Sequence, residues 1–169
     1  APLIVCMTTS TGDIYHRKDP ECKQVFVDAL LKGVIGHNIA YDMACAANTW
    51  PDTLPLIFDA YDNGRVYDSM LKAQLYRISR GQLKKFRQYS LKALAKRWFD
   101  IELEKNEVRV TFDEWDSTPI DQWPSEHIDY AIRDAVMTKQ VWDIIPEVEN
   151  EKEQCRYAFA LHLMGTWGI

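Results

Sequence analysis

The sequence is poor in the residues that mark a secreted, disulfide-bonded or membrane protein. Its four cysteines lie far apart without a Cys-x-x-Cys spacing, so we expect neither a disulfide framework nor a zinc site. No apolar run reaches the roughly 20 residues of a membrane-spanning helix. The first residues carry no basic-then-apolar leader. We therefore expect a cytoplasmic protein (in the host cytoplasm if it is viral) that is not secreted and has no membrane partner.

Glycine and proline are also scarce, at seven each in 169 residues, and we find no repeat or low-complexity linker. A hydrophobic share of 47% is enough for a sizeable core, and the length favours one globular domain. Short apolar segments alternate with segments of helical periodicity, which predicts an α/β fold.

The expected elements follow that alternation. Strands are predicted over residues 2–10, 14–17, 34–37 and the start of 66–78, and helices over 20–33, 39–48, 53–64, the rest of 66–78, 91–99, 125–145 and 147–164. Asp19 and Asn38 are expected to cap their helices, and Asp68 or Ser69 caps the helix that follows. Residues 100–123 are the least regular, and 108–112 is read as either a strand or an extended strap.

Acidic residues are missing from one segment of an otherwise acidic chain. The net charge is −5, yet residues 72–97 hold nine Lys or Arg and no Asp or Glu. The rest of the chain has eleven basic and 25 acidic residues. Such a segment favours a polyanionic partner, and the aromatic residues among or beside its charges could stack bases: Tyr76, Phe86, Tyr89 and Trp98. The alternative is a solvated helical face.

Two acids stand within largely apolar helical segments. Asp42 follows a short apolar strand, and we expect it at the buried edge of a strand-to-helix turn. Tyr130 and Asp134 lie four residues apart, so they share one helix face. Taken singly, each acid is read as a structural hydrogen-bonding group.

Together these motifs resemble those of the DEDD 3′–5′ exonucleases, in the variety whose third motif contains tyrosine. "GHNIAYD" (36–42) resembles the second motif and "YAIRDA" (130–135) the third. Between them, "VYDSMLKAQL" (66–75) is similar to the family's Asp-Thr-Met-Leu segment, with Ser69 replacing Thr. "YSLKALAKRWFDIELEK" (89–105) is similar to its Ser-Leu-Lys-x-Leu-Ala helix and following lysine. The resemblance implies a ribonuclease H-like (DnaQ-like) α/β fold with a mixed central sheet flanked by helices.

The resemblance implies metal-dependent hydrolysis of phosphodiesters. The family's roles place Asp134 on the ion that activates the attacking water and Asp42 on a second ion, each Mg²⁺ or Mn²⁺. Two such ions lower the pKa of the water and stabilise the leaving oxygen, and hard cations prefer carboxylate ligands. Tyr130 would orient the water, because a phenol stays protonated at neutral pH. Asn38 would hold its motif's turn or touch the substrate.

The implied substrate is the 3′ end of single-stranded DNA. Besides Asn38, the side chains expected to contact it are His37, Arg80, Lys84, Lys85, Arg87 and Lys105. His37 taken alone is more often a turn or core residue than a ligand. An RNase D-like exonuclease acting on RNA is the main alternative, because those enzymes share the two motifs. A catalytically inactive module that binds nucleic acid is the other.

The family's first motif, Asp-x-Glu on the first strand, is missing. "PLIVCMTTS" (2–10) contains no acid, "DPE" (19–21) lies at a predicted helix start, and "DIE" (100–102) follows the second motif. Either the chain is truncated, with the first strand absent, or it is a degenerate module. We favour truncation, because "APLIVCM" resembles the family's second strand and a dead module has little reason to keep Asp42, Tyr130 and Asp134. The fragment alone can then be inactive.

The resemblance also divides the chain. Residues 1–146 would form the exonuclease domain, and 147–169 would lead into a polymerase domain, because "EVENEKEQCRYAFALHLMGTWGI" resembles the entry to the polymerase body in family A DNA polymerases. The tryptophan-rich 100–123 segment resembles phage-type members. The implied parent is a proofreading DNA polymerase. A plain amphipathic helix closing the domain is the alternative for 147–169.

Overall fold

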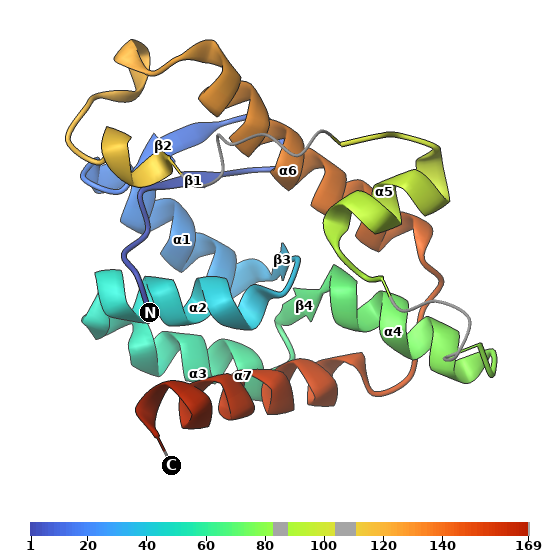
Figure 1. Cartoon of the computed structure of the whole chain (residues 1–169). Coiled ribbons are helices and arrows are strands. Elements are labelled where there is room, and N and C mark those ends of the chain that lie inside the picture. Colours follow the sequence, from blue (N-terminus) through green and yellow to red (C-terminus); the bar gives the residue numbers. More distant parts are fainter. Residues whose placement is uncertain (83–87, 104–110, 169) are drawn as a thin grey trace.

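A computed structural model of the chain describes residues 1–82, 88–103 and 111–168 (Figure 1). The strands are β1 (Cys6–Thr8), β2 (Ile14–His16), β3 (Val34–Gly36) and β4 (Val66–Asp68). The helices are α1 (Pro20–Lys32), α2 (Ile39–Thr49), α3 (Leu54–Asp62), α4 (Ser69–Ser79), α5 (Leu91–Phe99), α6 (Ser125–Ile144) and α7 (Glu151–Trp167), with short 3-10 turns η1 (Pro51–Thr53), η3 (Phe112–Trp115) and η4 (Ile120–Gln122). The predicted α/β alternation is confirmed.

The strands pair in two separate sheets rather than one. β1 pairs antiparallel with β2, placing Cys6 opposite His16, and β3 pairs parallel with β4, placing Gly36 opposite Asp68. Within the described residues no strand joins β1 to β3, so the expectation of one mixed central sheet is corrected. The sheet is divided because no described segment forms a strand between β1 and β3, so each of these two strands pairs on one side only.

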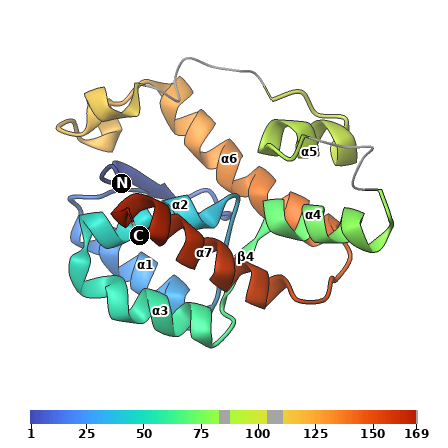
Figure 2. The same ribbon diagram turned by 60° about the horizontal axis from the view of Figure 1, so that its bottom comes forward.

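Two hydrophobic clusters form the core. The larger joins α1, α2, α3, β4 and α7, and its largest fully buried side chains are Leu30, Met43, Ile57 and Phe159. The smaller joins α4, α5 and α6 through Ala73, Leu94, Met137 and Val141. Helix α7 therefore packs in the same core as the helices before it, alongside α2 and α3 (Figure 2).

Helix α6 is the element that spans both sheets. It packs on β1 and β2, on β3, and on α4 and α5. His127, near its start, is buried, as are Met137 and Val141 in its second half, but every position between His127 and Met137 is half-buried or exposed. Those positions include apolar side chains such as Ile132 and Val136. The middle of α6 is thus an incompletely covered apolar surface between two sheets that do not meet.

Several local predictions need correction. The strand predicted over 2–10 is regular only over Cys6–Thr8, and the helix predicted from residue 147 begins at Glu151. Asp19 precedes α1 but makes no cap bond; it accepts the amide of His16 instead. The expectation for residues 108–112 falls almost wholly outside the described residues. Where the chain is described, no helix is both long and apolar enough to cross a membrane.

Candidate active site

Two strand-to-helix junctions lie side by side at the centre of the molecule. β3 leads into α2 and β4 leads into α4, and the two parallel strands end at the same level, with Gly36 opposite Asp68. A methyl group at Gly36 would lie 2.7 Å from the Cβ of Ile39. Ile39 is buried, so only glycine allows the chain to turn from β3 into α2 at this point.

Asp68 connects the two junctions. Its side chain is 1% exposed and accepts the amides of Met70 and Leu71, at 2.8 and 3.3 Å, which caps α4 as predicted. The same carboxylate accepts the amides of Asn38 and Ile39, at 3.1 and 3.0 Å. Asn38 itself occupies the N-cap position of α2 in a left-handed conformation (φ 59°), but its side chain makes no cap hydrogen bond. The prediction that the Asn38 side chain caps α2 is therefore wrong.

His37 also lies at this junction. Its Nδ1 is 2.9 Å from the hydroxyl oxygen of Ser69, which is fully buried at the start of α4. His37 is half-buried. The structure therefore places it between the two helices, and its expected contact with substrate stays a prediction.

Asp42 lies in the first turn of α2 and is exposed, so the expectation that it occupies a buried edge is wrong. The helical period explains the difference: Met43, Ala44 and Ala46 turn toward the core, whereas Asp42 lies on the solvent side. An acid in the first turn of a helix is favourable in itself. Its exposure also gives metal ions and water access to the carboxylate.

Tyr130 and Asp134 lie one turn apart in the half-buried middle of α6. The ring of Phe112, from η3, is 6.1 Å from that of Tyr130, and the guanidinium carbon of Arg133 is 5.8 Å from the Tyr130 ring. Since α6 packs on β3 and β3 leads into α2, the elements that carry Asp134 and Asp42 are in contact through that strand.

The carboxylates of Asp42 and Asp134 are of the type that binds a hard divalent cation, but two carboxylates are too few to hold the two expected ions. Asp42 and Asp134 supply carboxylate oxygens, the ligands that Mg²⁺ prefers. Among the residues that the structure describes, however, no three His, Cys, Asp or Glu side chains gather as a metal site. The expected metal ligation by Asp42 and Asp134 remains a prediction, and it needs further ligands.

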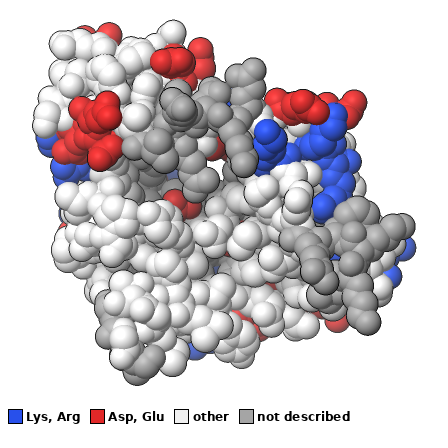
Figure 3. Space-filling view, in the orientation of Figure 1, with Lys and Arg blue, Asp and Glu red and all other residues white. Residues whose placement is uncertain are grey.

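The basic segment is only partly available to a polyanion. Arg80 is exposed at the end of α4 and its side chain donates to the hydroxyl of Tyr76 at 3.3 Å. Lys and Arg also gather over α5 (Figure 3). Lys72, by contrast, is 3% exposed and donates to the Trp142 carbonyl at 2.9 Å. The remaining expected contacts, Lys84, Lys85, Arg87 and Lys105, lie outside the described residues.

Lys72 belongs to a buried polar cluster that joins α4, α6 and α7. Its ammonium lies 3.9 Å from the Trp142 ring centroid, and the Trp142 indole donates to Glu151 at 2.8 Å. Burial lowers the pKa of Lys72 and raises the pKa of Glu151. No spacing in the sequence indicated this cluster, because Lys72 lies 70 residues before Trp142.

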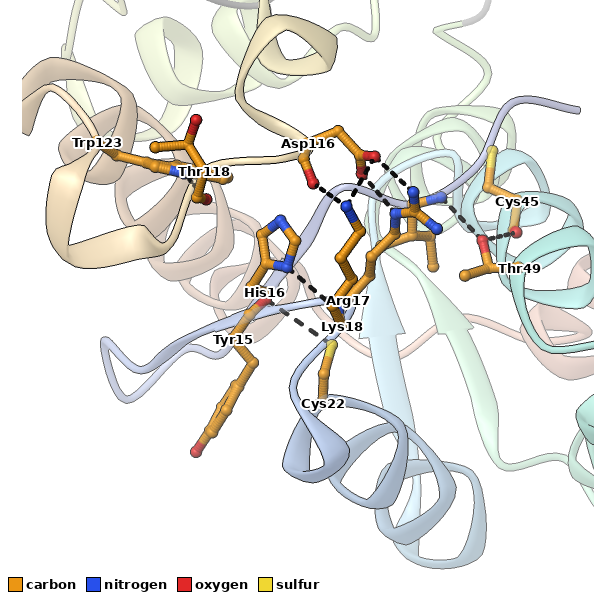
Figure 4. Close-up of polar contacts among 11 residues, drawn as sticks. Tyr15, His16, Arg17, Lys18, Cys22, Cys45, Thr49, Asp116, Thr118 and Trp123 are labelled. Atoms are coloured by element: carbon orange, nitrogen blue, oxygen red, sulfur yellow. Dashed lines mark hydrogen bonds and ion pairs between the residues drawn. The ribbon is translucent and has the colours of Figure 1, made fainter.

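A second unpredicted contact holds the 112–123 segment beside α6. Arg17, directly after β2, donates through Nε and Nη2 to the two carboxylate oxygens of Asp116 (Figure 4). Lys18 donates to the Asp116 carbonyl at 2.7 Å. The Arg17 guanidinium lowers the pKa of Asp116 to about 2. The pair fixes the segment that places Phe112 against Tyr130.

Comparison with known protein families gives a match over most of the chain. The model of a family described as 3′–5′ exonuclease, of the DNA polymerase A type, matches residues 12–148, which is most of the chain. No curated protein and no solved structure matches the chain.

Proposed function

Since this chain belongs to the 3′–5′ exonuclease family of the DNA polymerase A type, we propose that it is the DEDD-type proofreading domain of a DNA polymerase, of phage type. It would remove nucleotides from the 3′ end of single-stranded DNA. The observation that carries the proposal is the placement of the motif residues: Asp42 is exposed just beyond β3, and Asp134 lies on the helix that packs on β3.

Each side chain has a distinct role in this proposal. Asp42 and Asp134 would hold two Mg²⁺ or Mn²⁺ ions, which supply an activated water and stabilise the leaving 3′ oxygen. Tyr130 would orient that water through its hydroxyl, and its ring lies near Phe112 and the Arg133 guanidinium. Asn38, His37 and the cations beyond α4 would hold the strand and its phosphates.

The remaining ligands would come from an Asp-x-Glu strand that residues 1–169 do not contain. Two features support this part of the proposal. β1 and β3 pair on one side only within the described chain, and the middle of α6, which packs on both, is incompletely covered. One added strand between β1 and β3 would join the two sheets, cover α6 and bring the missing acids to Asp42 and Asp134.

The C-terminal helix supports a covalent partner in the same way. α7 fills the core with Cys155, Phe159 and Leu163 while leaving Tyr157, Leu161 and Met164 exposed. Residues 147–169 would thus close this domain with one face and lead into the polymerase domain.

A cleavage assay tests the proposal. The chain, extended at its N-terminus by an Asp-x-Glu strand, is incubated with 5′-labelled single-stranded DNA and Mn²⁺ or Mg²⁺. Its Asp134→Ala variant and the control Asp129→Ala, an exposed acid on the same helix, are assayed beside it. A ladder of shortened products that only Asp134→Ala abolishes is the expected result, and a ladder that survives Asp134→Ala contradicts the proposal. Faster cleavage of a matched RNA would favour the RNase D-like alternative.

A nucleic-acid-binding module without catalysis is the second candidate, favoured because no three metal-ligating side chains gather within the described part of the chain. It predicts binding of single-stranded DNA that needs no Mg²⁺ and weakens steeply with salt. The double variant Lys84→Ala with Lys85→Ala should weaken that binding. Absence of a ladder from the chain extended by an Asp-x-Glu strand, together with such binding, would replace the first proposal by this one.

A further inference from the structure

We propose that Asp68 is a positioning residue for the candidate metal site: its carboxylate fixes the first turn of α2, which carries Asp42, against the start of α4. The inference rests on the proposed function for the role of Asp42. The tie itself between α2 and α4 is independent of that function.

The hydrogen bonds show that one carboxylate serves two helices. Oδ1 accepts the amides of Met70 and Leu71 in its own helix, and also the amide of Asn38 in α2. Oδ2 accepts the amide of Ile39 in α2. The two acceptor atoms are therefore shared between segments 30 residues apart in the sequence.

Helix α2 depends on this external cap. The four amides at a helix start have no partner within the helix and need one elsewhere. The side chain of Asn38, at the N-cap position, makes no cap bond, because its left-handed backbone directs it otherwise. Asp68 takes that place from the neighbouring strand.

The hydrogen bonds of Asp68 hold α2 firmly against α4. A buried carboxylate is costly unless it is fully hydrogen-bonded, and Asp68, at 1% exposure, receives four amide N–H groups. Hydrogen bonds to an ionised acceptor are roughly twice as strong as neutral ones. The N-terminal dipoles of α2 and α4 both favour the negative charge. The bond between His37 and Ser69 joins the same two junctions a second time.

Asp42 lies one helical turn beyond Asn38, so its position follows the position of that first turn. Mg²⁺ requires near-ideal ligand geometry, and ligand distances within about 0.2 Å of their preferred values mark a working site. Loosening the start of α2 would therefore weaken a metal ion held by Asp42 even though Asp68 does not touch the ion.

Two substitutions separate this role from simple capping of α4. Serine is as good an N-cap as aspartate, so Asp68→Ser keeps α4 capped, but its shorter side chain does not reach α2. Asp68→Asn keeps the shape and one acceptor oxygen for α4, and replaces Oδ2, the acceptor of the Ile39 amide, by a donor. Ser90→Ala, which removes the side-chain cap of α5, is the control for loss of a cap elsewhere.

The first readout is amide hydrogen exchange of the whole chain, resolved by NMR. Losing a hydrogen bond to an ionised group costs about 1.5–3 kcal/mol, so exchange at Asn38 and Ile39 should accelerate at least about tenfold in Asp68→Ser. Exchange at Leu71 should change little, and Ser90→Ala should alter neither. Unchanged exchange at Asn38 and Ile39 in both Asp68 variants overturns the inference.

The second readout is Mn²⁺ affinity, measured by titration beside Asp42→Asn. We expect Asp68→Ser and Asp68→Asn to lower the affinity about tenfold or more and Ser90→Ala to leave it unchanged. If Asp42→Asn abolishes binding but the Asp68 variants do not weaken it, the positioning role is overturned. If Asp42→Asn leaves the Mn²⁺ affinity unchanged, the metal site of the proposed function is wrong, and so is the positioning role of Asp68. The exchange data then still show whether Asp68 holds the start of α2 against α4.

Discussion

Gly36 is a position at which the structure leaves no room for a side chain. A Cβ there would lie 2.7–2.8 Å from three side-chain atoms of buried Ile39. Forcing an extra methyl into such a site typically costs about 1–3 kcal/mol. Gly36→Ala should therefore lower the free energy of unfolding by that amount, measured by urea denaturation.

Gly165 provides the matched comparison. It lies within α7, and a Cβ there meets nothing within 4 Å. Gly165→Ala should stabilise the chain by about 0.5–1 kcal/mol, because alanine favours the helix and loses less entropy on folding. Equal effects of the two substitutions would contradict the crowding seen at Gly36.

The candidate site residues were predictable from the sequence only as far as short-range spacing reaches. Tyr130 and Asp134, four residues apart, share one face of their helix whichever face packs inward. The spacing within 36–42 places Asp42 just after a strand. The exposure of Asp42 depends on which face of α2 packs inward, which the spacing does not determine. The hydrogen bond from the Ile39 amide to Asp68 and the contact of buried Lys72 with Trp142 join segments that are distant in the sequence. No local pattern of residues predicts either contact.

Among the elements, the segment from η3 to η4 is attached to the end of β2 by ion pairs that Arg17 and Lys18 form with Asp116. Arg17 holds the pKa of Asp116 at about 2, below its ordinary value of 3.8. A lowered pKa means that the pair stabilises the folded state above about pH 4 and that the stabilisation disappears as protonation proceeds toward about pH 2. The pair is partly exposed, which limits its contribution to about 1 kcal/mol.

Asp116→Asn should accordingly lower the free energy of unfolding by about 1 kcal/mol at pH 7. The difference from the unchanged protein should shrink as the pH falls from about 4 toward 2. Asp113→Asn, an exposed acid of the same segment, is the control. A difference that persists unchanged at the lowest pH would show that the charge of Asp116 is not its source. Urea denaturation across the pH series provides the measurement.

The helices were predictable more closely than the strands. The helices α1, α2, α4, α5 and α6 begin and end close to their expected residues, because apolar side chains recur with the helical period in each of them, whereas α7 begins later than the expected residue 147. The strands are only three residues long, too short for alternation to set their ends. The split into two sheets depends on pairing between segments, which periodicity does not encode.

At the scale of the whole molecule, apolar side chains are buried in the two clusters but only half-buried on the middle of α6, between the two sheets. Val136 and Val141 belong to the same helix, yet Val141 is fully buried and Val136 is only half-buried. Removing the same two methyl groups should thus cost about 2 kcal/mol in Val141→Ala and less than about 1 kcal/mol in Val136→Ala. Denaturation of the two variants measures the difference, and equal costs would contradict the incomplete covering of α6.

The division of the strands into two pairs also bears on how the chain folds. β1 and β2 are joined by a tight turn, and β3 and β4 by α2 and α3, so each pair closes a loop of modest length. Short loops cost little entropy to close and form early. α6 contacts β1 and β2, near the start of the sequence, as well as β3, α4 and α5, so we expect its docking to complete folding late. Substitutions in α6 should then accelerate unfolding more than they slow refolding, in stopped-flow kinetics.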